Sequence, residues 1–326
     1  MSTIIVTVSR RLRCTCVLLA LALFAGCKPG NETGPNPTSK PRVALVMKSL
    51  ANEFFLTMEN GAKTHQQAHA ADYELLANGI KDELDVSRQI DLVEQMIAQK
   101  VDAIVIAPAD SKALVPVCKK AQQAGITVVN IDNKFDDTVL AASGVKFPFV
   151  GPDNRKGAKA VGDALAAKLK PGDGVIIVEG APNAFNGMQR KLGFEDAMSA
   201  AGMKIISSQS GYWETDKANQ VVASLITEHP ELKAVLCAND SMALGAVAAL
   251  RAAGKQTQVL VVGYDNIGAV RQLVREGKIL ATADQHADRL AVFGIEYALE
   301  TLKTKSAAAD RETPVDLVMA ESLPGK

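Results

Sequence analysis

Short apolar runs alternate with amphipathic stretches along the chain after residue 41. The runs include VALVM, AIVIAP, TVVNID, GVIIVEG, AVLCAND and VLVVGYD, and the stretches between them include ELDVSRQIDLVEQMIAQK and SMALGAVAALRAAGK. Continuous β-branched runs are typical of strands buried on both faces, whereas apolar positions three and four apart are typical of helices. The pattern therefore predicts βαβ units built on parallel sheet.

The starts of the apolar runs are spaced alike in two halves of the chain. Runs begin near residues 43, 73, 103 and 127, and again near residues 174, 204, 234 and 259. This predicts an α/β fold with two similar Rossmann-like parallel-sheet lobes instead of one long sheet. KFPFVGPDN lies between the halves and is expected to be a crossing. The final helix, ADRLAVFGIEYALETLKTK, and the final strand, TPVDLVMA, are too short to fold alone, so the chain is expected to cross more than once.

The first 27 residues have the pattern of a secretory signal. Three arginines precede the apolar run CVLLALALFAG, which is too short to span a bilayer comfortably. The run ends in LFAGC, which resembles a lipobox, so residues 1–27 are predicted to be a lipoprotein signal peptide with lipidation at Cys27. An ordinary cleaved signal and an uncleaved anchor are the alternatives. Residues 28–41 are rich in Pro, Gly, Asn and Thr and are predicted to be a flexible tether.

Charge and cysteine content exclude several classes of protein. Lys plus Arg and Asp plus Glu each number 36, so neither a nucleic-acid partner nor a charged membrane footprint is expected. Cys118 and Cys237 are predicted on a helix and a strand of different halves, which favours two buried free thiols over a disulfide. His65 and His69 have no third ligand nearby in sequence, so no metal site is expected, and no cofactor is expected either.

Polar and aromatic residues gather where the predicted strands end. In open α/β sheets, ligands bind outside the carboxyl ends of the strands. The residues at these ends are Lys48, Asn52, Phe54, Phe55, Asp132, Asn133, Trp213, Asn239, Asp240, Asp265 and Gln285. Aromatic rings can cover the C–H faces of a sugar ring, and amides, carboxylates and guanidinium groups can bind its hydroxyls. The composition of this edge, drawn from both halves, therefore favours a sugar site.

Each of these residues could instead have an ordinary structural role. Phe55 fits an apolar helix stripe with Met58 and Ala62, whereas Phe54 does not. Asp240 is expected to cap the helix that follows it, which would leave Asn239 free to face a ligand. The remaining structural roles are a helix cap for Asn52, loop carboxylates for Asp132 and Asp265, a core position for Trp213 and a solvated helix face for Arg190.

At these residues the chain resembles the periplasmic sugar-binding proteins of ABC transporters, of the ribose- and allose-binding type, which have the type I periplasmic binding protein fold. LANEFF resembles that family's motif of Asn, any residue and two aromatics, and NAFNGMQRKLGF, AVLCANDSMALGA, VLVVGYDNI and ILATADQ match further segments in order. The resemblance implies that the sugar contacts are Asn52, Phe54, Phe55, Asp132, Arg190, Trp213, Asn239, Asp265 and Gln285. Phe54 and Phe55 would cover one face of the ring and Trp213 the other.

Three positions depart from the ribose-binding pattern. Lys48 matches the allose pattern instead, Asn133 matches neither pattern, and Ala107 replaces an asparagine. The resemblance places all three at the hydroxyl rim of the sugar. Lys48 and Asn133 are therefore added to the expected ligand-binding residues, and a hexose or modified sugar is favoured over ribose.

The resemblance also implies three crossings between the lobes, near Gly151, His286 and Asp316. The expected N-terminal lobe comprises residues 42–151 plus 286–316, and the expected C-terminal lobe comprises residues 152–285 plus 317–326. Hinge closure around the ligand is the implied mechanism.

The implied function is capture of a monosaccharide in the periplasm or at the cell surface, by a monomer anchored to the membrane through its lipid, and delivery to an ABC permease. A sensor that presents sugar to a chemoreceptor or membrane kinase is the alternative with the same fold. A repressor of the lac-repressor family shares the two-lobe core, but a secretion signal stands here in place of a DNA-binding headpiece. An enzyme is not expected, because no nucleophile elbow or phosphate loop accompanies Asp132 and Asp265.

Overall fold

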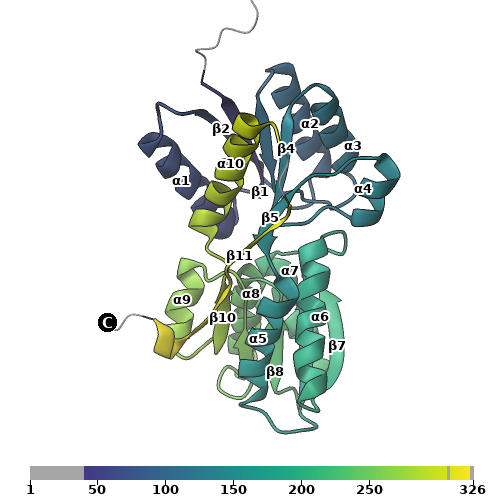
Figure 1. Cartoon of the computed structure of the whole chain (residues 1–326). Coiled ribbons are helices and arrows are strands. Elements are labelled where there is room, and N and C mark those ends of the chain that lie inside the picture. The colour runs from purple at the N-terminus through teal and green to yellow at the C-terminus, as the bar shows by residue number, and fades with distance from the viewer. Residues whose placement is uncertain (1–39, 307–308, 324–326) are drawn as a thin grey trace, which may run out of the picture. The chain divides into compact units, whose positions relative to one another are not determined.

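The computed structural model describes residues 40–306 and 309–323, which form two α/β lobes (Figure 1). The predicted signal peptide, Cys27 and nearly all of the predicted tether lie outside the described residues. The prediction of two similar lobes with parallel-sheet cores is confirmed.

The N-terminal lobe is built on a six-stranded parallel sheet in the order β11-β5-β4-β3-β1-β2. Its strands are β1 (Arg42–Ser49), β2 (Glu74–Ile80), β3 (Ala103–Ile106), β4 (Thr127–Ile131), β5 (Phe149–Pro152) and β11 (Arg311–Thr313). Its helices are α1 (Glu53–Ala68), α2 (Val86–Ala98), α3 (Val115–Gln123), α4 (Asp137–Ser143) and α10 (Ala287–Thr304).

The C-terminal lobe repeats this arrangement with the order β12-β10-β9-β8-β6-β7. Its strands are β6 (Gly174–Glu179), β7 (Lys204–Ser210), β8 (Ala234–Cys237), β9 (Leu260–Val262), β10 (Ala281–Asp284) and β12 (Asp316–Met319). Its helices are α5 (Asn154–Ala166), α6 (Phe185–Ala200), α7 (Thr215–Glu228), α8 (Asp240–Ala252), α9 (Gly268–Arg275) and the 3₁₀ helix η1 (Ala320–Ser322). Only β12 runs antiparallel to its neighbour among the described strands.

Strand β1 shows why the apolar runs are continuous. Val43, Leu45 and Met47 pack on one side of the sheet with α1 and α10, while Ala44 and Val46 pack on the other side with α2 and α3. Successive side chains point to opposite faces, so a strand covered on both faces needs an apolar residue at every position. The carboxyl ends of such strands are left as the places where polar residues can gather.

The chain passes between the lobes three times, after β5, after β10 and after β11 (Figure 1). KFPFVGPDN is more than the crossing predicted, because it contains β5, which pairs with β4 and β11. The prediction that TPVDLVMA forms a single strand was also wrong. Thr313 ends β11 in one sheet, and Asp316 begins β12 in the other, with Pro314 between them.

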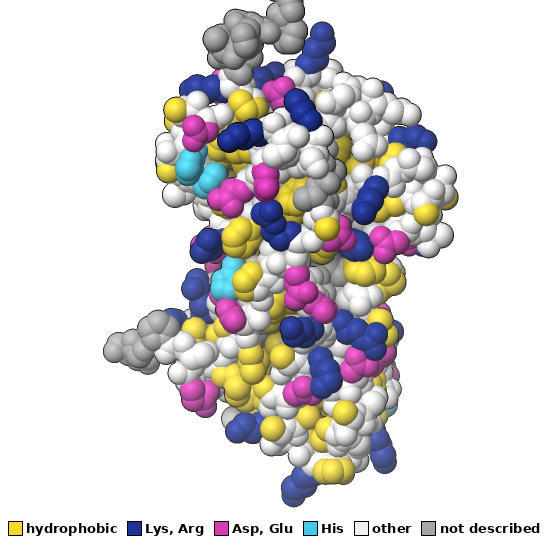
Figure 2. All heavy atoms as spheres, in the orientation of Figure 1, with side chains coloured by type: hydrophobic (Ala, Val, Ile, Leu, Met, Phe, Trp, Pro, Cys, Tyr) yellow, Lys and Arg dark blue, Asp and Glu magenta, His cyan; other side chains and the backbone are white. Residues whose placement is uncertain are grey.

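The two cysteines of the lobes are buried free thiols, as predicted, with Cys118 in α3 and Cys237 in β8. Burial raises the pKa of both thiols, so they stay protonated. Lysines and arginines are interspersed with carboxylates over the face shown in Figure 2. Within residues 40–306 and 309–323, no helix has the length and hydropathy needed to cross a bilayer.

Candidate ligand-binding site

A small cavity lies where the two lobes meet. The N-terminal lobe lines it with Lys48, Asn52, Phe54, Phe55, Glu83 and Asp132, and the C-terminal lobe with Asn186, Arg190, Trp213, Asn239, Asp265 and Gln285. All of these residues except Asn52 are buried, so the lobes enclose the cavity. Every predicted ligand-binding residue except Asn133 is therefore brought to one place.

Aromatic rings from both lobes form the apolar walls. Phe54 and Phe55 lie in the first turn of helix α1, and their ring centroids lie 5.1 Å apart in an edge-to-face arrangement. Phe55 also packs with Met58 in the core, so this side chain both belongs to the helix's apolar stripe and lines the cavity. From the opposite lobe comes Trp213, the only tryptophan of the chain.

The indole of Trp213 depends on a glycine beneath it. A Cβ atom added at Gly180 would lie 2.1 Å from the indole carbons Cη2 and Cζ2, well inside van der Waals contact. Gly180 follows strand β6 directly, so the bare backbone at the end of this strand makes room for the ring. The sequence offered no clue to this pairing, because the two residues are distant along the chain.

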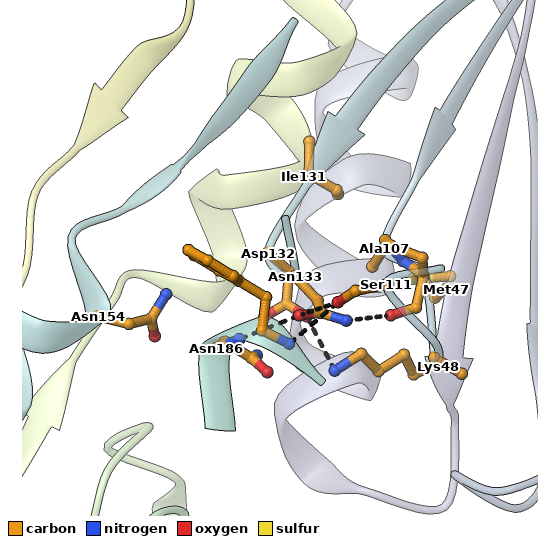
Figure 3. Close-up of polar contacts among 12 residues, drawn as sticks. Met47, Lys48, Ala107, Ser111, Ile131, Asp132, Asn133, Asn154 and Asn186 are labelled. Carbon is orange, nitrogen blue, oxygen red and sulfur yellow. Dashed lines mark hydrogen bonds and ion pairs between the residues drawn. The ribbon is translucent and has the colours of Figure 1, made fainter. Parts of the chain in front are cut away.

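A buried ion pair supplies the polar part of the N-terminal lobe. Lys48 Nζ lies 3.3 Å from Asp132 Oδ2, and both side chains are nearly inaccessible to solvent (Figure 3). The same ammonium group lies 5.6 Å from the ring centroids of Phe55 and Trp213. Asp132 Oδ2 has no properly directed hydrogen bond in spite of this ion pair, so it retains acceptor capacity.

Arg190 is held rigidly in the C-terminal lobe. Its Nε donates to Asn154 Oδ1 at 2.8 Å, and its Nη1 donates to the carbonyl of Ala238 at 2.9 Å and to Asp265 Oδ1 at 3.4 Å. The guanidinium also stacks over Tyr264 at 3.8 Å from the ring centroid. The solvated helix face considered for Arg190 is therefore wrong, since α6 directs this side chain inward.

Asp265 and Gln285 form the other polar wall. Gln285 Nε2 donates to Asp265 Oδ1 at 2.7 Å, while Gln285 Oε1 is buried without a partner among the described residues. Burial raises the pKa of Asp265 well above its ordinary value, and the positive charge of Arg190 opposes that shift. The amide and carboxyl groups are thus fixed by protein contacts before any ligand arrives.

Several cavity residues adopt backbone conformations that favour glycine. The φ angles of Asp132, Trp213 and Asp265 are 59°, 69° and 122°. Such conformations cost on the order of 1–3 kcal/mol each and cluster at functional sites. In this protein they turn three side chains from the strand ends into the cavity.

The cap of helix α8 differs from the prediction. Asn239, not Asp240, caps the helix by accepting a hydrogen bond from the Met242 backbone at 2.9 Å, and Asn239 still lines the cavity. Asp240 is engaged elsewhere, because it accepts from Thr282 Oγ1 at 2.8 Å and from the Ile267 backbone at 2.9 Å. The cap considered for Asn52 is present too, since Asn52 accepts from the Phe54 backbone and also lines the cavity.

Asn133, which was expected to face the sugar, does not line the cavity. Its Nδ2 donates to the carbonyl of Pro108 at 2.7 Å, and its Oδ1 accepts from Ser111 Oγ at 3.3 Å and from the Asn186 backbone at 3.1 Å. Both ends of the amide are therefore occupied by protein. Ala107 does not line the cavity either.

Two cavity residues, Glu83 and Asn186, were missed. Glu83 follows β2, so the rule that ligands bind at strand ends applied to it as to the others. Asn186 precedes Arg190 by one helical turn, and residues four apart share a helix face. The spacing NGMQR would have found it once Arg190 was accepted.

Comparisons with known proteins show the family and the fold of this chain. The family model for the periplasmic binding protein domain matches residues 43–306. A D-ribose/D-allose-binding protein of Pseudomonas aeruginosa is 58% identical over 316 residues, which cover 96% of this chain and 98% of that protein. Two solved structures are similar throughout both lobes.

The first is an ABC transporter solute-binding protein from Burkholderia multivorans with an unknown ligand represented as alpha-D-erythrofuranose. Its TM-score is 0.85 at 61% identity, covering 86% of this chain and 100% of that one. The second is a periplasmic solute-binding protein of an ABC transporter from Actinobacillus succinogenes with bound D-allose. Its TM-score is 0.82 at 36% identity, covering 86% of this chain and 98% of that one.

Proposed function

The chain belongs to the periplasmic binding protein family, and on that premise we propose that it captures a monosaccharide between its lobes for delivery to an ABC permease. The sugar is of the ribose and allose type named for its relatives. The sensor alternative draws no support from those relatives, because the two solved structures are named as solute-binding proteins of ABC transporters.

One observation carries the proposal: residues that line a cavity walled by aromatic rings hold buried acceptor atoms that accept no hydrogen bond within the described part of the chain. Asp132 Oδ2, Asn186 Oδ1 and Gln285 Oε1 are all buried, lack hydrogen-bond partners in the described part of the chain and belong to residues lining the cavity. Each unpaired buried group costs about 1–3 kcal/mol. A sugar donates hydroxyl hydrogens to such acceptors while its C–H faces contact Phe54 and Trp213.

Cationic and amide side chains supply the hydrogen-bond donors that the hydroxyl oxygens of a sugar need. Lys48, Arg190 and the amide of Asn239 supply donors, so hydroxyl oxygens find partners as well. Because the cavity residues come from both lobes, a bound sugar links the lobes and favours their closed arrangement. The moving bodies are the N-terminal lobe, which runs from β1 to β5 and includes α10 and β11, and the C-terminal lobe, which runs from α5 to β10 and includes β12.

The proposal also covers the location, the membrane anchor and the oligomeric state of the protein. It acts outside the cytoplasm as a monomer, anchored through lipid on Cys27, and it binds its ligand without chemical change. The signal pattern of residues 1–27 supports the location and the lipid anchor. Labelling with a radioactive fatty acid, lost in a Cys27→Ala variant, tests the anchor.

A sugar panel tests the binding function. Because Trp213 is the only tryptophan, its fluorescence reports on the cavity alone. We expect one of ribose, allose, xylose, galactose and inositol to change that fluorescence at micromolar concentration, with calorimetry giving one site per chain. The absence of both signals for all five compounds would contradict the proposal.

A further inference from the structure

We propose that Ser111 and Asn133 are positioning residues that hold the lobes closed by capping helix α6 from the opposite lobe. The inference rests on the proposed function, because closure is taken to trap the sugar. It assigns a role to Asn133, which the cavity itself does not use.

Helix α6 lacks a cap of its own. Its N-cap residue is Ala184, which has no side-chain acceptor, and the helix begins at Phe185. The first backbone N–H groups of a helix have no partner within the helix and need one from elsewhere. By contrast, α2 and α5 are capped by Asp85 and Asp153 of their own segments.

The missing cap comes from the N-terminal lobe. The Phe185 backbone donates to Ser111 Oγ at 2.9 Å, and the Asn186 backbone donates to Asn133 Oδ1 at 3.1 Å. Ser111 lies in the loop after β3 and Asn133 in the loop after β4. Figure 3 shows Ser111, Asn133 and Asn186 together, where the end of α6 meets these loops.

The two acceptors are themselves held in place. Asn133 Nδ2 donates to Pro108 at 2.7 Å, which turns Oδ1 toward α6, and Ser111 Oγ donates to that same Oδ1 at 3.3 Å. Beside them, the Ser111 backbone donates to the carbonyl of Asn183 at 3.1 Å, and Asn183 Nδ2 donates to Asp110 Oδ2 at 2.8 Å. Four hydrogen bonds therefore join the lobes along one edge.

The capped end of α6 also carries cavity residues. Asn186 has its backbone N–H bound to the opposite lobe, while its side chain lines the cavity with Arg190. Closure thus fixes the same turn of α6 that faces the sugar. When the lobes separate, water replaces Ser111 and Asn133 as the acceptor for these N–H groups. The hydrogen bonds between the lobes therefore favour the closed form although they do not touch the ligand.

The test compares Ser111→Ala with Asp85→Ala, which removes a helix cap inside one lobe. Stopped-flow fluorescence of Trp213 gives the rates of sugar binding and release. Losing one such bond is expected to raise the dissociation rate about fivefold, with the association rate unchanged, because the bond forms only after closure. Asp85→Ala should lower the melting temperature and leave both rates as in the wild type.

A third variant separates the latch, by which we mean the hydrogen bonds from Ser111 and Asn133 to the start of α6, from the stability of that helix. Ala184→Ser gives α6 a cap of its own. Added to Ser111→Ala, it should restore the melting temperature but not the slow release of sugar. If it restores slow release, or if Ser111→Ala releases sugar at the rate of Asp85→Ala, the latch is refuted.

Hydrogen exchange keeps the inference separate from the sugar-binding proposal. In the ligand-free protein and in the protein saturated with sugar, Ser111→Ala should speed exchange of the Phe185 amide relative to Asp85→Ala, most strongly with sugar present, since a capped amide is protected while the lobes are closed. Equal exchange rates would contradict the latch even if a sugar binds. If the Phe185 amide exchanges faster in Ser111→Ala but no sugar binds, the latch is supported and only the proposed sugar-binding function is contradicted.

Discussion

At the scale of single residues, the buried carboxyl group of Glu83 makes the site sensitive to pH. Burial raises the pKa of Glu83 from 4.5 to about 7, although the positive charge of Lys48 opposes the shift. Because this pKa is higher in the folded protein than in the unfolded chain, folding favours the protonated form. The resulting stabilisation is fully present below pH 4.5 and is lost as the pH rises through 7.

Replacing Glu83 with glutamine should therefore stabilise the protein only at high pH. The uncharged amide avoids burying a negative charge, so we expect a gain of about 1–3 kcal/mol in the free energy of unfolding at pH 8 that disappears by about pH 4. Urea unfolding at both pH values measures it. Glu312→Gln, at an exposed position, is the matched control, and an equal gain at both pH values would contradict the explanation.

The contact between Gly180 and Trp213 leads to a second prediction at this scale. In Gly180→Ala, the added Cβ must displace the indole, so sugar affinity should fall at least about tenfold, the effect of roughly 1.4 kcal/mol. Gly174→Ala changes the first residue of β6, the strand that Gly180 follows, but its Cβ would lie 3.4 Å from Ile206 in ordinary contact. Calorimetric titration of both variants decides the matter. Equal affinities would show that Trp213 tolerates displacement.

At the scale of elements, helix α1 positions its aromatic residues through close packing on α10. A Cβ added at Gly61 would lie 1.9 Å from the backbone oxygen of Asp288, at the start of α10. Only a residue without a side chain permits this approach. Since Phe54 and Phe55 lie in the first turn of α1, the spacing between these two helices sets where one wall of the cavity lies.

Gly61→Ala should consequently push α1 away from α10. Overpacking of this kind costs about 1–3 kcal/mol, so we expect a lower melting temperature together with weaker sugar binding. The neighbouring exposed change Asn60→Ala should leave both unchanged. Calorimetry of unfolding and of binding would reveal the pair of effects, and a loss of stability without loss of affinity would mean that the wall does not move with the helix.

The sequence predicted most strands and helices because two-sided burial leaves a continuous apolar signal. It missed β5 and β11, which are short and flanked or followed by prolines, so no local pattern separates them from loops. The cavity residues were predictable in so far as they follow strand ends. The engagement of Asn133 and the burial of Asp240 depend on partners far along the chain, such as Asn186 and Thr282, and no local pattern encodes those contacts.

At the scale of the whole molecule, the two lobes meet around a cavity to which each contributes charged and aromatic groups. The N-terminal lobe brings the Lys48–Asp132 pair, and the C-terminal lobe brings Arg190 with Asp265. Neither half can surround a sugar without the other. Affinity is thus a property of the closed arrangement, and it includes the free energy of closing.

A bound sugar contacts both lobes, so it should stabilise the two of them together against unfolding. At a free concentration about 100 times the dissociation constant, the free energy of unfolding should rise by about 2.7 kcal/mol. Small-angle X-ray scattering should show a smaller radius of gyration at the same concentration. A non-binding sugar from the panel is the control, and a gain in stability without compaction would argue against hinge closure.

The alternation of β11 and β12 between the two sheets has a consequence for biosynthesis. The N-terminal sheet takes its outermost strand from residues 311–313, although its first strand begins at residue 42. A ribosome or translocation channel releasing the chain from its amino end must therefore deliver nearly all of it before that sheet is complete. No single cut in the gene would yield two fragments that each encode a whole lobe.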